Sequence, residues 1–139
     1  WVIRFVVLLH LAALHGAVLL VTLGYKIDIP RVMLLSMGVV FLVLGGILGK
    51  IRPNWFVGVR TPWTLSSRLS WTHSQRAEGW VFIALGLVTF VAVLLRTPWN
   101  LAVALGCTLL GAAGLVFYSY LVWRRDPDRV PPSGTTPAD

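Results

Sequence analysis

The stretch KIRPNWFVGVRTPWTLSS, residues 50–67, divides a chain that is otherwise almost continuously apolar. It places Lys50, Arg52 and Arg60 among tryptophan and phenylalanine rings and interrupts them with prolines and a glycine. The 139 residues are 57% hydrophobic and 12% charged, whereas a soluble domain carries about 25% charged residues. This composition is typical of integral membrane proteins, so residues 50–67 are expected to separate one group of membrane spans from another.

Four apolar segments are long enough to cross a bilayer, which takes roughly 17–25 helical residues. They cover residues 5–24, 32–49, 80–95 and 101–123. The first is expected to be a span and not a signal peptide, because its apolar run is longer than the ~7–15 residues of a signal core. The sequence therefore predicts an all-α integral membrane four-helix bundle. An interfacial loop or short helix, the motif loop of residues 50–79, joins its second and third helices.

Basic residues are divided unequally between the two sides of such a bundle. The side with both termini and the motif loop carries nine, and the other side carries Lys26, Arg31 and Arg96. Because basic residues are enriched in cytoplasmic loops, both termini and the motif loop are expected in the cytoplasm. With a net charge of +7 confined to the span ends, anionic lipid headgroups are the expected partners, with no direct binding of nucleic acid. Residues 1–125 form the membrane domain, and residues 126–139 are expected to be a disordered tail.

Small residues recur at helical spacing in two of the spans. Gly45 and Gly49 are four residues apart, as are Cys107 and Gly111, with Gly114 close by. Small residues let membrane helices approach closely, either within one chain or between two copies. The spacing predicts close packing in the second and fourth spans, and intramolecular contact is the simpler interpretation.

His10 and His15 are the histidines of the first span. At 100° per residue they lie about 140° apart around a helix, so they do not share a ligand face. Each is expected to bond a neighbouring helix or to lie near the interface, although a polar residue within a span can also be functional.

The motif loop contains several local structure signals. RPNW predicts a β-turn, and Thr61 should be extended because it precedes Pro62. Ser66 or Ser67 is expected to cap a helix that continues to about Glu78 and leads into the third span. One face of this helix gathers Leu69, Thr72, His73, Arg76 and Trp80.

The run GKIRPNWFVGVRTPWTLSSRLSW, residues 49–71, resembles the signature of the SdpI/YfhL family of bacterial membrane proteins. The resemblance takes in about residues 45–95 and implies a location in the bacterial cytoplasmic membrane. It also implies immunity to a secreted toxic peptide or, in some systems, relay of that signal to a repressor. The matching residues are Lys50, Arg52, Pro53, Asn54, Trp55, Phe56, Gly58, Arg60, Thr61, Pro62, Trp63, Thr64, Leu65, Ser66, Trp71 and Arg76.

The chain departs from the family pattern at three places. Arg68 and Leu69 stand where two acidic residues usually follow the serine, Gln75 replaces a histidine, and an asparagine is replaced around Gly46. The loss of the acidic pair removes favourable negative charge from a helix N-terminus. Functions that depend on those residues are not carried over.

Two interpretations of the motif remain open. Arg52 and Arg60, in a frame of proline and tryptophan, could bind a lipid phosphate or a peptide carboxylate through paired hydrogen bonds. Trp55, Trp63 and Trp71 could offer surfaces to an apolar or cationic side chain. Alternatively, the same residues only anchor the loop at the headgroup layer.

Immunity to a membrane-active toxin peptide, or its signalling, is the leading hypothesis for function. A non-catalytic accessory subunit of a larger membrane complex is the alternative, and the spans have too few polar residues for a transporter. Enzyme activity is not expected, because the serines near His73 have only Glu78 as an orienting carboxylate. Scattered histidines and the lone Cys107 form no metal-ligand set, and no cofactor is expected.

Overall fold

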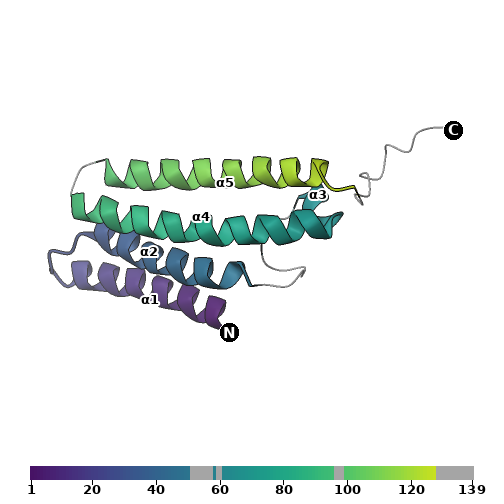
Figure 1. Cartoon of the computed structure of the whole chain (residues 1–139). Helices are drawn as coiled ribbons and strands as arrows, with labels where there is room; N and C mark the ends of the chain where they lie inside the picture. The colour runs from purple at the N-terminus through teal and green to yellow at the C-terminus, as the bar shows by residue number, and fades with distance from the viewer. Residues whose placement is uncertain (51–57, 59–60, 96–98, 128–139) are drawn as a thin grey trace.

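The computed structural model describes residues 1–50, 58, 61–95 and 99–127. Within these residues the chain is all-helical, with four long helices and one short one (Figure 1). The helices are α1 (Val2–Thr22), α2 (Ile29–Leu48), α3 (Pro62–Leu65), α4 (Arg68–Leu95) and α5 (Asn100–Arg124). The four long helices are apolar enough to cross a membrane, which confirms the predicted architecture.

The helix α2 begins three residues before the predicted span. Asp28 caps it by accepting a hydrogen bond from the Arg31 backbone N–H at 3.2 Å, and Pro30 lies in the first turn. Proline is favourable there because its missing N–H would have no helical partner. The Arg31 guanidinium also lies 3.0 Å from the Asp28 carboxylate, so this helix start is held by its own charged residues.

The helix α4 is one continuous element of 28 residues. The predicted third span at residues 80–95 and the predicted helix before it are therefore one rod, about 42 Å long at 1.5 Å per residue. By the same measure α2, with 20 residues, is about 30 Å long and matches the hydrocarbon thickness of a bilayer.

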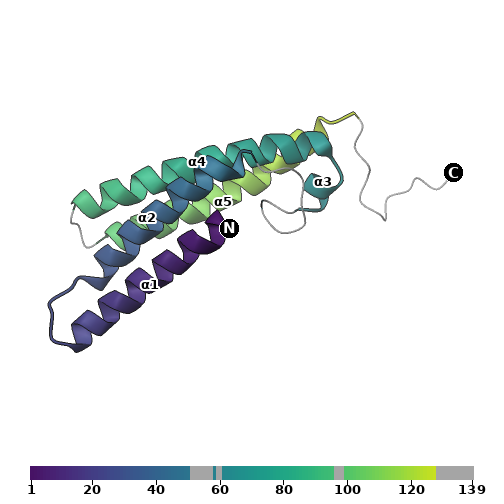
Figure 2. The same ribbon diagram turned by 90° about the horizontal axis from the view of Figure 1, so that it is seen from below.

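The long helices are arranged in the order α1, α2, α4, α5 as an open bundle (Figures 1 and 2). Among the described helices, α1 contacts α2 alone, whereas α4 packs extensively against both α2 and α5. At one end of the bundle α4 and α5 extend past the α1–α2 pair, and α3 packs against these two helices there. We call this end, formed by α3 with the start of α4 and the end of α5, the motif end.

Paired glycines bring the backbones of α2 and α4 together at two levels. A Cβ atom on Gly45 would lie 2.8 Å from the Gly79 carbonyl oxygen, and one on Gly86 would lie 3.1 Å from the Gly38 carbonyl oxygen. The two glycines of each helix are seven residues apart, about two turns, so both pairs face the same partner. The predicted packing face at Gly45 is confirmed and lies within the chain.

Two other predicted packing features have different outcomes. A Cβ atom on Gly111 would meet the Val81 side chain at 3.1 Å, so Gly111 faces α4 as expected of a packing glycine. Gly114 has nothing within 4 Å of an added Cβ, and it therefore does not extend that contact.

A polar contact links α1 to α2. The Nδ1 atom of His10 lies 2.8 Å from the Ser36 hydroxyl, within hydrogen-bond distance. The Ser36 hydroxyl also donates a hydrogen bond of 2.7 Å to the Val32 carbonyl. His10 thus bonds a neighbouring helix, as predicted, while His15 is exposed.

Candidate functional site

The motif end is organised by the one-turn helix α3. Thr61 is extended before Pro62, as the sequence predicts, and it caps α3. The Thr61 hydroxyl accepts from the Thr64 backbone N–H at 3.3 Å, and the Thr64 hydroxyl accepts from the Thr61 N–H at 2.9 Å. This reciprocal pair of bonds between Thr61 and Thr64 is a capping box, and it stabilises α3 although the helix has only four residues.

Trp63 fastens α3 to the end of α5. Its indole Nε1–H donates a hydrogen bond of 2.7 Å to the Ser119 hydroxyl. Its ring also meets Tyr120 edge to face, with 5.5 Å between the ring centroids, and Tyr120 continues to Trp123 at 5.9 Å. Edge-to-face aromatic pairs are stabilising beyond their buried area, so the three rings form a fixed platform.

The N-terminus of α4 is stabilised by Ser67, which directly precedes the helix, and by Asp126, which follows α5. Ser67 accepts a hydrogen bond from the Ser70 backbone N–H at 2.9 Å, which confirms the expected serine cap. The Ser67 hydroxyl in turn donates to the Asp126 carboxylate, a residue that is only 8% exposed and that the sequence placed in the tail. Negative charge is favourable at a helix N-terminus. Asp126 therefore supplies, from the end of α5, the acidic group that Arg68 and Leu69 do not supply.

The first turns of α4 have two different faces. The exposed face holds Leu69, Thr72, His73, Arg76 and Trp80, as predicted. The opposite face is buried but largely polar: its serines are fully buried, Gln75 is 2% exposed and Glu78 is 7% exposed. On this face the Ser70 hydroxyl donates to the Ser119 carbonyl at 2.9 Å, so hydrogen bonds join α4 to α5.

Gly58 lies directly against this buried face. Its φ is +112°, a conformation that residues with side chains rarely adopt. A Cβ atom at this position would lie 1.9 Å from the Gln75 amide nitrogen. The glycine of the motif thus allows close contact with Gln75, the residue that replaces the histidine of the family pattern.

A cavity of about 360 Å³ lies beside this contact, between α4 and α5. Gly58, Thr61 and Glu78 line its polar part, and apolar side chains of α4 and α5 form most of its remaining wall. Its other lining residues are Val81, Phe82, Leu85, Thr108, Ala112, Leu115 and Val116. The cavity therefore combines a polar region with an apolar one, which suits an amphipathic ligand.

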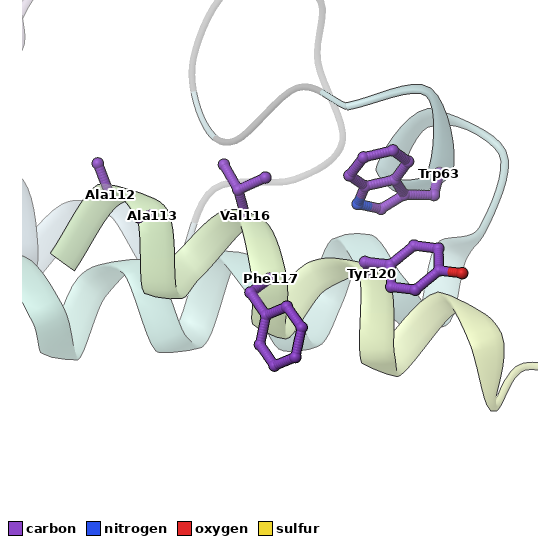
Figure 3. Close-up of a pocket in the computed structure, with 6 residues that line it drawn as sticks. All are labelled: Trp63, Ala112, Ala113, Val116, Phe117 and Tyr120. Carbon is purple, nitrogen blue, oxygen red and sulfur yellow. The ribbon is translucent and has the colours of Figure 1, made fainter. Parts of the chain in front are cut away.

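An open groove of about 510 Å³ follows α5 next to the platform (Figure 3). Trp63 and Tyr120 lie close together at one end of it, and Ala112 and Val116 lie further along the helix. Because these two α5 residues also line the cavity, the groove and the cavity are neighbours across a thin wall.

The predicted site residues fall into four groups. Within the described part of the chain, Gly58, Thr61, Pro62, Trp63, Thr64 and Ser66 gather at the motif end, while Lys50 and Arg76 are exposed near the end of α2. Trp71 is 4% exposed, and its buried indole N–H has no hydrogen-bond partner in the described residues, so its ring offers no open surface. Arg52, Pro53, Asn54, Trp55, Phe56 and Arg60 lie outside the described residues.

Sequence reasoning missed three contributors to this site. Ser119 looked like an end-of-span residue, and Asp126 looked like part of the tail, because their partners lie 49 to 59 residues away in the sequence. Glu78 could have been found, since Ser70, Ser74 and Glu78 recur every four residues on one helical face.

Within the ranges that the structure describes, no group of three or more histidine, cysteine or acidic residues gathers as a metal site. The motif end instead provides an aromatic platform, a hydrogen-bonded polar layer and an amphipathic cavity.

Four candidate spans and a polar, aromatic cap on two of them define a multi-pass helical membrane protein. The chain belongs to the SdpI/YfhL protein family, whose model matches residues 50–121, over half of its length. The match includes α3, α4 and most of α5, so it extends further than the resemblance over residues 45–95. Neither the curated proteins nor the solved structures include a match to this chain.

Proposed function

We propose that this protein gives a bacterial cell immunity to a membrane-active toxin peptide, or signals the presence of that peptide to a cytoplasmic repressor. The observation that carries the proposal is the position of the family motif. Its Thr61–Ser66 part forms and flanks α3, which packs against the start of α4 and is held to the end of α5 by the bond between Trp63 and Ser119. The motif therefore lines a cavity and a groove, where a ligand would meet it.

An amphipathic peptide fits the chemistry of these two hollows. A peptide that partitions into a bilayer carries apolar side chains on one face and polar groups on the other. The apolar walls contributed by α4 and α5 suit the apolar side chains, while Thr61 and the platform of Trp63 and Tyr120 suit the interfacial face. The excess of basic residues at this end supports a cytoplasmic location for it.

A filling substitution tests whether these hollows act in protection. Ala112 is exposed and lines both the cavity and the groove, so Ala112→Leu should occupy part of each. In a sensitive bacterium that expresses the protein, we expect this change to lower the peptide concentration that cells tolerate at least severalfold. The readout is growth across a peptide dilution series, with membrane levels of the protein measured by immunoblot.

Ala102→Leu is the matched control, since Ala102 is also exposed on α5 but lines neither hollow. It should leave protection unchanged. Equal protection by Ala112→Leu and the unmodified chain, at equal protein levels, would contradict the assignment to these hollows. Arg60→Ala and Trp63→Ala extend the test to the motif itself, and both should abolish protection without loss of the protein from membranes.

The alternative role is that of an accessory subunit in a larger membrane complex. The position of α1 supports this role. Among the described helices α1 contacts α2 alone, and its outer face is apolar, so a partner protein could pack against it. Purification from membranes in mild detergent, followed by mass spectrometry, separates the two roles. A stoichiometric large partner, together with no protection from toxin, would establish the accessory role.

A further inference from the structure

A shallow groove of about 230 Å³ lies between the end of α2 and the middle of α4, away from α3 and α5. Lys50 reaches it from the end of α2, and Arg76 and Trp80 reach it from α4. Between them its floor is formed largely by glycines of the two helices. It is thus distinct from the cavity and the groove of the proposed toxin site.

The groove is positively charged. Lys50 and Arg76 are both exposed, and within the described part of the chain neither side chain forms a hydrogen bond or an ion pair. The acidic residue nearest to Arg76 in the sequence, Glu78, is buried on the face of α4 that lines the cavity toward α5. Two cations, one just after α2 and one on α4, therefore line one small hollow with no side-chain partner among the described residues.

The depth of the groove matches the headgroup layer. The helix α2 is about as long as the hydrocarbon layer is thick, so its end at Leu48 marks one membrane boundary. Trp80 is 73% exposed at this level, and exposed tryptophans are enriched at the membrane interface. A lipid phosphate and the two cations would therefore lie at the same depth.

Gly46 and Gly49 keep the groove open. A Cβ atom on Gly46 would have no neighbour within 4 Å, and one on Gly49 would come no closer than 4.0 Å to Arg76. The absence of side chains here lets a ligand approach the helix backbone.

From these observations we propose that the groove binds the phosphate headgroup of an anionic phospholipid in the leaflet at the motif end. Lys50 and Arg76 bind the phosphate, and Trp80 packs beside the part of the lipid that adjoins the headgroup. At the headgroup layer, lipid is the abundant source of phosphate. This inference does not depend on the proposed immunity function.

Native mass spectrometry of the full chain in detergent, titrated with phosphatidylglycerol or phosphatidylcholine, tests the proposal. We expect tighter binding of phosphatidylglycerol. Lys50→Gln and Arg76→Gln should each weaken it about fivefold, the contribution expected of one basic residue near an anionic surface. Gly46→Leu should weaken it as well, because the new side chain occupies the groove without meeting the neighbouring helix.

Two control variants make the result specific to this groove. Arg125→Gln removes an exposed cation at the end of α5, and Gly114→Leu adds the same side chain where an added Cβ also has open space. Both should bind phosphatidylglycerol as the unmodified chain does. An equal loss with Arg125→Gln, no preference between the two lipids, or no loss with Lys50→Gln and Arg76→Gln would overturn the proposal.

Competition with inorganic phosphate distinguishes two sources of a phosphate group in this groove, a lipid headgroup and free phosphate in solution. Millimolar phosphate should not displace phosphatidylglycerol from the unmodified chain. Displacement at that concentration would assign the groove to soluble phosphate and overturn the lipid assignment. Thermal unfolding of each variant in the same detergent checks that lost binding does not reflect a lost fold.

Discussion

Ser119 joins three helices through two different atoms. Its hydroxyl accepts a hydrogen bond from Trp63 on α3, and it gives its own proton to the Val116 carbonyl within α5. Its carbonyl accepts a hydrogen bond from Ser70 on α4. Because Ser119 is fully buried, these bonds are shielded from water, and the residue holds the motif end together.

Ser119→Ala should lower the free energy of unfolding by about 1–3 kcal/mol, since the Trp63 indole N–H loses its acceptor while the bond from Ser70 remains. Thermal unfolding in detergent measures this. Trp63→Phe removes the same hydrogen bond from the other side, so the double variant should lose less stability than the sum of the two single variants. Fully additive losses would show that the two side chains do not interact.

Ser70 and Ser74 form a matched pair on the buried face of α4. Both are fully buried, but the Ser70 hydroxyl donates to α5 whereas the Ser74 hydroxyl has no partner in the described residues. Ser70→Ala should therefore lower the free energy of unfolding by about 1 kcal/mol, and Ser74→Ala should leave it unchanged or raise it. Equal losses for both variants in thermal unfolding would contradict the hydrogen-bond assignment.

At the scale of elements, the contact between α2 and α4 depends on glycine. Gly45→Ala places a methyl group about 2.8 Å from backbone atoms of α4, so the helices must separate. We expect a loss of about 1–3 kcal/mol in the free energy of unfolding, as in other overpacked contacts. Gly46→Ala is the control, because its methyl group meets open space. A similar melting temperature for both variants would show that the close approach is not required.

The cap on α4 gives a rescue experiment. Asp126→Ala removes the carboxylate beside the α4 N-terminus and should lower the free energy of unfolding by about 1 kcal/mol. Arg68→Glu in the same chain restores negative charge in the first turn, where the family pattern carries acidic residues, and should recover much of the loss. Thr72→Glu, beyond the first turn, should not. Thermal unfolding measures all three, and recovery by Thr72→Glu would indicate a general charge effect.

Whether a feature could be predicted depends on how far apart in the sequence the interacting residues lie. The four spans could be predicted because each is a long apolar run, and the Ser67 cap could be predicted because its partner is three residues away. The extended backbone of Thr61 was predicted from Pro62, but its cap on α3 was not. A helix leading into the third span was predicted, but it was treated as separate from that span because its turns are too polar to be recognised as part of one. Their polar face is buried against α5 and α3, through contacts that no local pattern encodes.

At the scale of the whole molecule, cysteine labelling tests the orientation. In a Cys107→Ser background, His73→Cys places a thiol on the exposed face of α4 at the motif end, and Lys26→Cys places one in the loop between α1 and α2. We expect a membrane-impermeant maleimide to label Lys26→Cys in intact cells and His73→Cys only after permeabilisation. The reverse pattern would place the motif end outside the cytoplasm.

The difference in length between α2 and α4 makes the protein sensitive to membrane thickness. The extra eight residues of α4 correspond to about 12 Å of rod beyond the hydrocarbon layer. Longer acyl chains would bring these polar turns toward the lipid tails, and α4 would have to stand more upright to keep them in contact with water. Since α3 is bonded to the neighbouring end of α5, it would travel with this movement. Cells that remodel their fatty acids would thereby change how deeply the motif end of this protein lies.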